Sequence, residues 1–288
     1  MKLFRHGPRG AERPGLVDAH GGWRDLSAVL PDIGPHTLGC DSMARLVAID
    51  PLSLPLLDAA TRLGPCVGGV GNVVCIGLNY ADHAAESNQP IPKEPIVFMK
   101  PTGVAVGCHH AVVLPRDSVK TDWEVELGVV IGSTARYVSE ADALKHVAGY
   151  CVVNDISERE YQLERGGTWD KGKGCDTFGP VGPWLVTADE VGDPQDLPMW
   201  LEVNGKRWQD GSTRTMIFGV AQLVSYLSRF MSLHPGDLIT TGTPPGVGLG
   251  AKPHPVYLKP GDTMRLGIGK LGEQQQTVHA WDPALIDG

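Results

Sequence analysis

Short apolar runs punctuated by glycine and proline dominate the chain, and they predict a protein built mainly of β-strands. The clearest run covers residues 122–131, where apolar and β-branched positions stop at Gly132. Other strand candidates are residues 72–78, 96–99, 112–114, 149–155, 184–186, 200–203, 238–240 and 264–268. One amphipathic helix is predicted within residues 217–231, because its apolar positions repeat at helical spacing: Ile217, Val220, Ala221, Val224, Leu227 and Met231.

Residues 1–68 are predicted to form a small N-terminal domain, followed by a larger domain at residues 69–288. The first part carries strand candidates at residues 2–4 and 15–18, and an apolar stretch at residues 56–63 that predicts a helix. Because strands outnumber helices, the pattern favours a β-rich α+β fold with an antiparallel or mixed sheet over a doubly wound parallel sheet.

Composition narrows the class of protein. A chain of 288 residues, 42% of them hydrophobic, can bury a sizeable core. The net charge of −8 argues against nucleic acid or an anionic membrane surface as a partner. No apolar segment is long enough to span a bilayer, and residues 1–7 lack the apolar core of a secretion signal. The six cysteines are scattered, which favours reduced thiols. We therefore expect a cytoplasmic protein.

Two glutamates interrupt the clearest apolar run. Side chains alternate between the faces of a strand, so Glu124 and Glu126 are predicted to project side by side. Asp155 ends a second apolar run and offers a third carboxylate. A hard divalent cation, Mg²⁺ or Mn²⁺, would relieve the repulsion between such groups. The alternative is a solvated sheet face. Zinc is not favoured, because the sequence holds neither an HExxH motif nor a CxxC pair.

His83 and Glu86 are three residues apart and would share one face of a helix. A carboxylate that orients an imidazole makes a general base for water. Residues 88–95 follow with three prolines, which predicts a surface loop and a candidate lid. The alternative for His83 and Glu86 is an ordinary surface pair.

Four further residues are candidates for contacts with a substrate. Lys173 lies between glycines and could serve as an oxyanion partner, although it could also be a solvated turn lysine. Arg159 and Gln162 follow Asp155 by four and seven residues, so a helical turn would place them on its side. Arg159 could bind a carboxylate or pair with a neighbouring glutamate. Thr243 lies in a donor-rich loop that could also be an ordinary turn.

The motifs, taken in order, resemble those of the fumarylacetoacetate hydrolase family. They are Gly77-Leu78-Asn79-Tyr80-Ala81-Asp82-His83, Glu124-Val125-Glu126-Leu127, Asn154-Asp155-Ile156-Ser157-Glu158-Arg159, Lys173-Gly174-Cys175-Asp176-Thr177-Phe178-Gly179-Pro180 and Thr241-Gly242-Thr243-Pro244-Pro245-Gly246-Val247. The resemblance covers about residues 70–282. It implies a mixed β-sandwich roll with a small N-terminal domain, assembled as a homodimer or a larger homo-oligomer.

The same resemblance implies roles for the candidate residues. Glu124, Glu126 and Asp155 would bind Mg²⁺ or Mn²⁺. His83 and Glu86 would form a water-activating dyad on a mobile lid, with Lys173 as a third catalytic residue. Arg159, Gln162 and Thr243 match the substrate-binding positions of the family.

The family acts mostly on 2-oxo and 2,4-dioxo acids, so the resemblance implies hydrolysis of a C3–C4 bond to pyruvate and a carboxylic acid. Residues 3–10 and 13–19 are similar to the subgroup that cleaves 2,4-diketo-3-deoxy-L-rhamnonate or fuconate to pyruvate and L-lactate. Alternatives on the same metal site are an oxaloacetate decarboxylase or acylpyruvase, a ureidoglycolate lyase, and a binding protein without turnover. The acyl group beyond C4, its stereochemistry, the physiological metal and the oligomeric state stay open.

Overall fold

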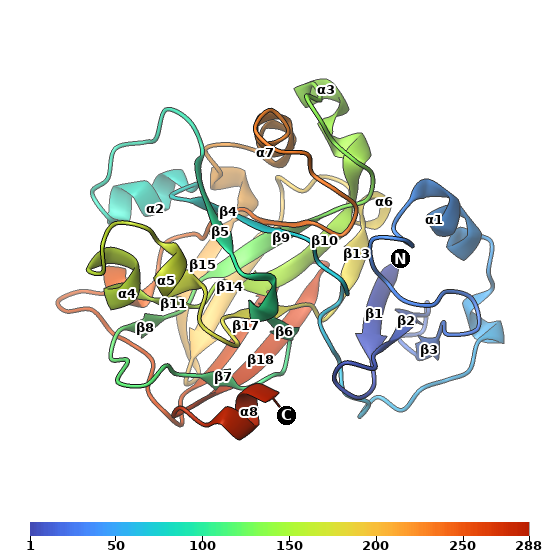
Figure 1. Cartoon of the computed structure of the whole chain (residues 1–288), viewed down its shortest axis with the longest axis horizontal. Coiled ribbons are helices and arrows are strands. Elements are labelled where there is room, and N and C mark those ends of the chain that lie inside the picture. Colours follow the sequence, from blue (N-terminus) through green and yellow to red (C-terminus); the bar gives the residue numbers. More distant parts are fainter. Residues whose placement is uncertain (288) are drawn as a thin grey trace.

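The computed structural model describes residues 1–287 and is dominated by two β-sheets (Figure 1). The larger sheet has eleven strands and runs β3-β2-β1-β13-β10-β9-β16-β4-β5, with β12 paired to β10 and β6 paired to β12. The smaller sheet runs β15-β14-β17-β18-β7, and β8 pairs with β11 separately. Antiparallel and parallel pairs both occur, so the predicted β-rich α+β fold with mixed sheets is confirmed.

The strands of the larger sheet are β1 Lys2–His6, β2 Arg13–Val17, β3 Trp23–Asp25, β4 Val73–Gly77, β5 Ile96–Lys100, β6 Ala105–Gly107, β9 Val125–Ile131, β10 Val147–Asn154, β12 Gly179–Val181, β13 Leu185–Thr187 and β16 Leu238–Thr240. The others are β7 Val112–Val113, β8 Thr121–Asp122, β11 Ser157–Glu158, β14 Pro198–Val203, β15 Lys206–Ser212, β17 Thr263–Ile268 and β18 Gly272–His279.

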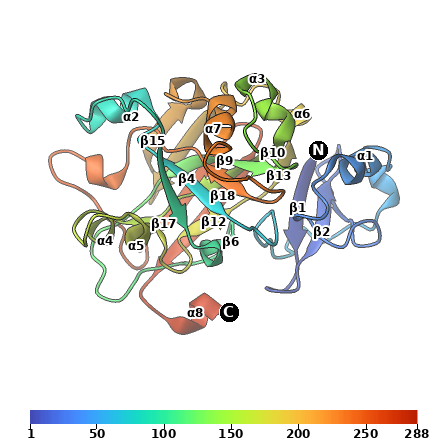
Figure 2. The ribbon, with the colours of Figure 1, turned by 45° about the horizontal axis from the view of Figure 1, so that its top comes forward.

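The helices are short and lie around the sheets. They are α1 Cys40–Val47, α2 Ala81–Glu86, α3 Glu140–Ala143, α4 Arg159–Leu163, α5 Asp170–Lys173, α6 Ala188–Val191, α7 Val220–Leu227 and α8 Pro283–Asp287. Single 3₁₀ turns cover Pro51–Ser53, Thr102–Val104, Leu144–His146, Thr213–Thr215 and Gly248–Gly250. In Figures 1 and 2, α2, α4 and α5 lie on the same side of the molecule, away from the N-terminal strands.

Strand β9 separates the main core from the polar site. Alternate residues of β9 join the core that β14 and β17 also line: Val125, Leu127, Val129 and Ile131. The residues between them face the other way, and Glu126 is one of these. Because every residue of β9 is buried, the strand forces a carboxylate into the interior opposite an apolar core.

The N-terminal strands extend the larger sheet. Strand β1 pairs with β13, with Lys2 opposite Val186 and Leu3 opposite Leu185. Leu3 is buried in a second apolar cluster together with Val153 and Leu185. The division after residue 68 and the homo-oligomer stay predictions, but the first part of the chain shares both a sheet and a core with the rest.

The helix predicted at residues 56–63 is wrong. Leu56 forms a bridge with Arg24, and Leu63 forms one with His6. Leu57 N donates to Trp23 O at 2.8 Å and Thr61 N donates to Asp58 O at 3.0 Å, so the segment contains a turn and bridges to the N-terminal strands at its two ends. Backbone pairing with neighbouring strands therefore overrides the local helical pattern.

The amphipathic helix predicted within residues 217–231 is confirmed as α7, which is shorter. It begins after Gly219 and ends at Leu227, and it buries Val220, Leu223, Val224 and Leu227. Within residues 1–287, no helix has the length and apolar character needed to cross a membrane.

Replacing Leu3 by alanine tests whether the N-terminal strands unfold with the rest of the chain. Leu3 is 1% exposed, so Leu3→Ala should cost about 2–5 kcal/mol of unfolding free energy and lower Tm in one transition. Leu52→Ala, at a position 53% exposed, is the control and should change Tm little. A calorimetric trace with two separate transitions, only one of them shifted, would instead indicate an independent N-terminal domain.

Candidate active site

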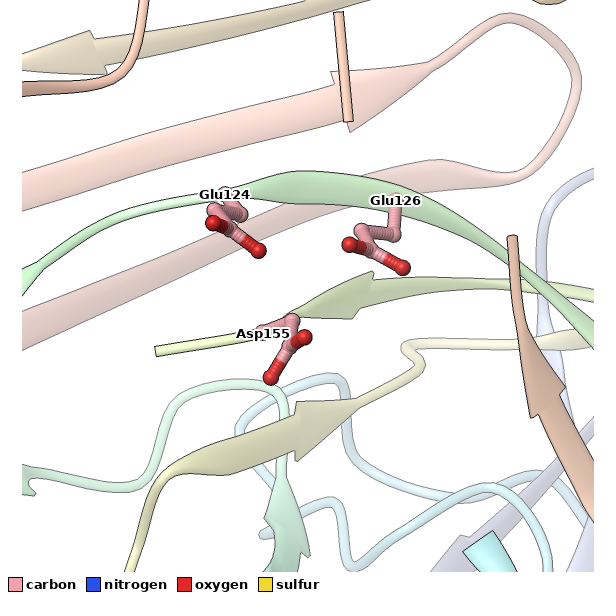
Figure 3. A group of neighbouring side chains, drawn as sticks. All are labelled: Glu124, Glu126 and Asp155. Carbon is pink, nitrogen blue, oxygen red and sulfur yellow. The ribbon is translucent and has the colours of Figure 1, made fainter. Parts of the chain in front are cut away.

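Three buried carboxylates meet where β9 and β10 lie side by side (Figure 3). Glu124 immediately precedes β9, Glu126 lies within it, and Asp155 immediately follows β10. Glu126 is opposite Val153 in the sheet, and Asp155 N donates to Glu124 O at 2.9 Å. One oxygen from each carboxylate lies within 4.8 Å of the others. The predicted cluster therefore forms, and antiparallel pairing is what brings Asp155 to the two glutamates.

Three buried cations surround this cluster. Lys173 Nζ lies 2.7 Å from both Glu124 Oε2 and Asp155 Oδ2. Arg159 contacts Glu124 Oε1 at 2.7 Å. Lys100, at the end of β5, donates to Asp155 Oδ1 and to the carbonyl oxygen of Phe178. Burial alone would raise the pKa of Glu124, but Lys173 and Arg159 outweigh it and lower the pKa to about 2.

Glu126 has the opposite titration behaviour. Burial is the largest cause that raises its pKa well above the usual value, and the negative charges of Asp155 and Glu124 add to it. Its Oε2 accepts a hydrogen bond from Gly242 N at 2.8 Å. With Asp122, the site holds four buried carboxylates against three cations, so an ionised Glu126 leaves one negative charge in excess.

The donor set fits a divalent cation. Three carboxylates with oxygens this close match the ligands that Mg²⁺ and Mn²⁺ prefer, and a cation would favour ionised Glu126. The described residues that meet this spacing are Glu124, Glu126 and Asp155. A divalent metal is therefore supported by the chemistry of the site, without a choice between magnesium and manganese.

His83 and Glu86 lie on α2 and contact each other, with His83 Nδ1 3.2 Å from Glu86 Oε2. Glu86 also accepts from Gly246 N at 3.2 Å. The hydrogen bond with His83 is the largest cause that lowers the pKa of Glu86, which keeps this carboxylate ionised. Asp82, at the start of the helix, accepts from Thr215 Oγ1 at 3.1 Å and so fixes α2 to the body of the protein.

The dyad and two residues of the carboxylate cluster, Glu124 and Glu126, line one cavity of about 570 Å³. Lys173 and the predicted substrate-binding residues Arg159, Gln162 and Thr243 line it too. An apolar part of its wall comes from β5 and the α4–α5 region: Ile96, Phe98, Leu163 and Trp169. Segments far apart in the sequence thus present both an acidic cluster and a histidine–glutamate pair to the same space.

The predicted substrate-binding residues are already engaged with protein groups. Arg159 Nη1 donates to Gln162 Oε1 at 3.0 Å, while its other nitrogens contact Asp122 and Glu124. Burial would lower the pKa of Arg159, but Asp122 and Glu124 outweigh it and raise it. Thr243 Oγ1 donates to Val125 O at 2.9 Å. Their contacts with a substrate stay a prediction.

Sequence reasoning missed three residues of the site. Lys100 and Asp122 are buried charges that contact the carboxylate cluster or its arginine. Trp169 lies against Gly77, where an added Cβ would come within 2.3 Å of its ring. The sequence signal available for Lys100 was a charged residue directly after the apolar run at residues 96–99. Nothing in the sequence pairs Trp169 with Gly77.

Comparisons with known proteins agree with this geometry. The sequence profile described as Fumarylacetoacetate (FAA) hydrolase C-terminal matches residues 72–279. A Burkholderia ambifaria protein provisionally named a hydrolase is 64% identical over 278 residues, which cover 96% of this chain and 99% of that protein.

Two solved structures share the fold. The maleylpyruvate hydrolase of Sphingobium sp. SYK-6, in complex with manganese(II) ion and pyruvate, has a TM-score of 0.80 at 29% identity, covering 98% of this chain and 100% of that one. The 2-hydroxyhepta-2,4-diene-1,7-dioate isomerase of Mycobacterium marinum has a TM-score of 0.73 at 31% identity, covering 97% and 98%.

The fold and the site define an enzyme in a superfamily that includes hydrolases and isomerases. The chain belongs to the fumarylacetoacetate hydrolase family.

Replacing Glu126 by glutamine tests the electrostatics of the cluster. Below the usual pKa of 4.5, Glu126 is protonated in both folded and unfolded chains. Above it, the unfolded chain ionises while the folded site resists, so wild-type stability falls as pH rises. Without divalent metal, Glu126→Gln should therefore have the higher Tm above pH 4.5, with a gap that widens with pH. Added Mg²⁺ or Mn²⁺ should raise the wild-type Tm more than that of the variant. A variant that is less stable than wild type at neutral pH in EDTA would contradict this account.

Proposed function

We propose that this enzyme hydrolyses the C3–C4 bond of a 2,4-dioxo acid and releases pyruvate and a carboxylic acid. The observation that carries the proposal is the shared cavity, which is lined by the His83–Glu86 pair and by Glu124 and Glu126 of the acidic cluster. A water-activating pair beside a divalent-cation site is the equipment that hydrolytic C–C cleavage requires. The maleylpyruvate hydrolase that shares this fold supports the proposal by its name and by its complex with pyruvate.

The residues of the chain divide the work in the following way. Because Nδ1 of His83 contacts Glu86, Nε2 is the nitrogen left to take a proton from water, whose oxygen attacks C4. Lys173 stabilises the negative charge that develops on the C4 oxygen. The C3–C4 bond then breaks, C4 leaves as the carboxylic acid, and the three-carbon fragment takes a proton at C3 to become pyruvate.

The remaining polar residues hold the substrate and the metal. A divalent cation held by Glu124, Glu126 and Asp155 would supply Lewis-acid activation of the 2-oxo acid when bound. Arg159, Gln162 and Thr243 line the same cavity and would position the oxygens of the acid. The cluster has one excess negative charge, so a divalent cation and the carboxylate of a monoanionic substrate together would make the site neutral.

For the acyl group beyond C4, we propose a 2,4-diketo-3-deoxy sugar acid, the rhamnonate or fuconate derivative, with L-lactate as the second product. This choice rests on the similarity of residues 3–10 and 13–19 to that subgroup. An oxaloacetate decarboxylase or a ureidoglycolate lyase on the same metal site would not need a base for water, and the His83–Glu86 contact favours hydrolysis over both.

Removing the imidazole tests the base. His83→Ala should lower kcat on the order of 10²- to 10⁴-fold, because the attacking water loses its proton acceptor. Metal affinity, measured by calorimetry, should not change, since His83 is not part of the carboxylate cluster. His279→Ala, which replaces a histidine at the end of β18, is the matched control. Full activity in His83→Ala would rule out the dyad as the water-activating group.

A pyruvate-release assay tests the substrate class. With Mg²⁺ or Mn²⁺, we expect release from acetylpyruvate and fastest release from a 2,4-diketo-3-deoxy hexonate, abolished by EDTA. Turnover of oxaloacetate alone, unaffected by His83→Ala, would indicate a decarboxylase. Release of urea and glyoxylate from ureidoglycolate would indicate the lyase.

A further inference from the structure

Asp122 is a fully buried carboxylate that the mechanism above does not use. It ends β8, two residues before Glu124. Its Oδ1 accepts from Gly248 N at 2.6 Å, and its Oδ2 accepts from Leu249 N at 2.9 Å and from Arg159 Nε at 2.8 Å. A buried carboxylate with this many donors is held rigidly, and it holds its donors in turn.

The backbone that donates to Asp122 belongs to the glycine-rich segment 246–250, which forms part of the cavity wall. The fit is close, because an added Cβ at Gly248 would lie 2.7 Å from Asp122 Oδ1 and 2.0 Å from Val256 O. Trp123 Nε1 donates to Gly246 O at 3.1 Å, so the residue after Asp122 adds a second support. The segment therefore takes its position from the residues next to Glu124.

The other side of segment 246–250 contacts Glu86 of helix α2. Gly246 N lies 3.2 Å from both carboxylate oxygens of Glu86. An added Cβ at Gly250 would lie 3.2 Å from the Glu86 carboxylate carbon, so the segment also packs against it. Glu86 in turn contacts His83, so the imidazole is positioned through this backbone.

Asp122 also reaches the carboxylate cluster directly. Arg159 bridges Asp122 Oδ2 and Glu124 Oε1, at 2.8 and 2.7 Å. One carboxylate thus connects Glu124, through Arg159, with Glu86, through segment 246–250. The dyad and the acidic cluster come from elements far apart in the sequence. Asp122 contacts Arg159, which holds Glu124, and segment 246–250, which holds Glu86.

We propose that Asp122 is a positioning residue that sets the distance between the His83–Glu86 dyad and the acidic cluster. It does so by fixing the position of segment 246–250, which contacts Glu86, relative to Glu124. Loss of its charge loosens the segment and helix α2 together, while the carboxylate cluster keeps its contacts with Lys100 and Lys173.

Hydrogen–deuterium exchange on the full chain with saturating Mg²⁺ tests this placement without any substrate. Asp122→Asn keeps the shape but replaces an acceptor oxygen with an NH₂ group that cannot accept from the segment. Exchange at the Gly248 and Leu249 amides should rise on the order of 10-fold, and exchange across α2 should rise with it. Asp210→Asn makes the same chemical change at an exposed side chain and should alter neither.

A second variant separates the two arms of Asp122. Arg159→Lys keeps a cation near Glu124 but loses the two-pronged contact with Asp122, and it should leave exchange in segment 246–250 unchanged. Equal rises in Arg159→Lys and Asp122→Asn would overturn the proposal, because Asp122 would then act through Arg159 alone. So would unchanged exchange in Asp122→Asn.

The kinetic arm rests on the proposed hydrolase function. Asp122→Asn should lower kcat on the order of 10-fold with little change in KM, because a displaced base acts in the transition state. Combined with Glu86→Gln, the loss should be no larger than that of the worse single variant, since both act through His83. Additive losses would place Asp122 outside the path to the dyad. If no 2,4-dioxo acid is turned over, only the proposed function fails, because the exchange experiment still decides the positioning role.

Discussion

Burial of like charge at the end of β8, the start of β9 and the end of β10 is the constraint on which the rest of the site depends. Glu124, Glu126, Asp155 and Asp122 lie in the interior, where uncompensated carboxylates are costly. Their negative charge is partly neutralised by Lys100, Lys173 and Arg159, each of which contacts one or two of the carboxylates. The three cations offset three of the four negative charges. Burial, with the charges of Asp155 and Glu124 added to it, raises the pKa of Glu126. A site arranged in this way has electrostatic room for a divalent cation and a monoanionic acid.

The two faces of β9 explain why such a costly arrangement can be stable. The strand packs four apolar side chains into the main core, so its position does not depend on the polar face. The second sheet adds support through buried glutamines: Gln274 Nε2 donates to Val152 O at 2.8 Å, and Asn154 Nδ2 donates to Gln276 Oε1 at 3.1 Å. Rigid strands of this kind hold charged groups at the separations that chemistry needs, which flexible loops do less well.

The proposed base is carried differently from the candidate metal ligands. His83 and Glu86 lie on a helix of six residues, followed by a proline-containing segment, and few buried contacts anchor it. Its position depends on the hydrogen bonds that Thr215 Oγ1 donates to Asp82 and that Gly246 N donates to Glu86. Carboxylates fixed by buried strands, opposite a histidine on a helix with few buried contacts, are consistent with a site that opens for substrate and closes for reaction.

The sequence by itself determined the β-rich class, the two-faced strand β9, helix α7 and the family, because these follow from local periodicity and short motifs. The strand predicted at residues 122–131 is shorter in the structure, because β9 begins at Val125 and residues 123 and 124 separate it from β8. It also selected the residues that gather around the cavity, although their roles are not tested by the fold. Glutamine-rich β18 was missed, although it pairs with β17, its neighbour in the chain. The sequence could not show that residues 56–63 bridge to the N-terminal strands or that β1 joins β13, because these contacts need a backbone partner distant in the chain. The contacts of Lys100 and Asp122, including the hydrogen bonds from segment 246–250 to Asp122, could not be predicted either. The sequence shows that a residue is charged, but only tertiary packing decides which groups it contacts.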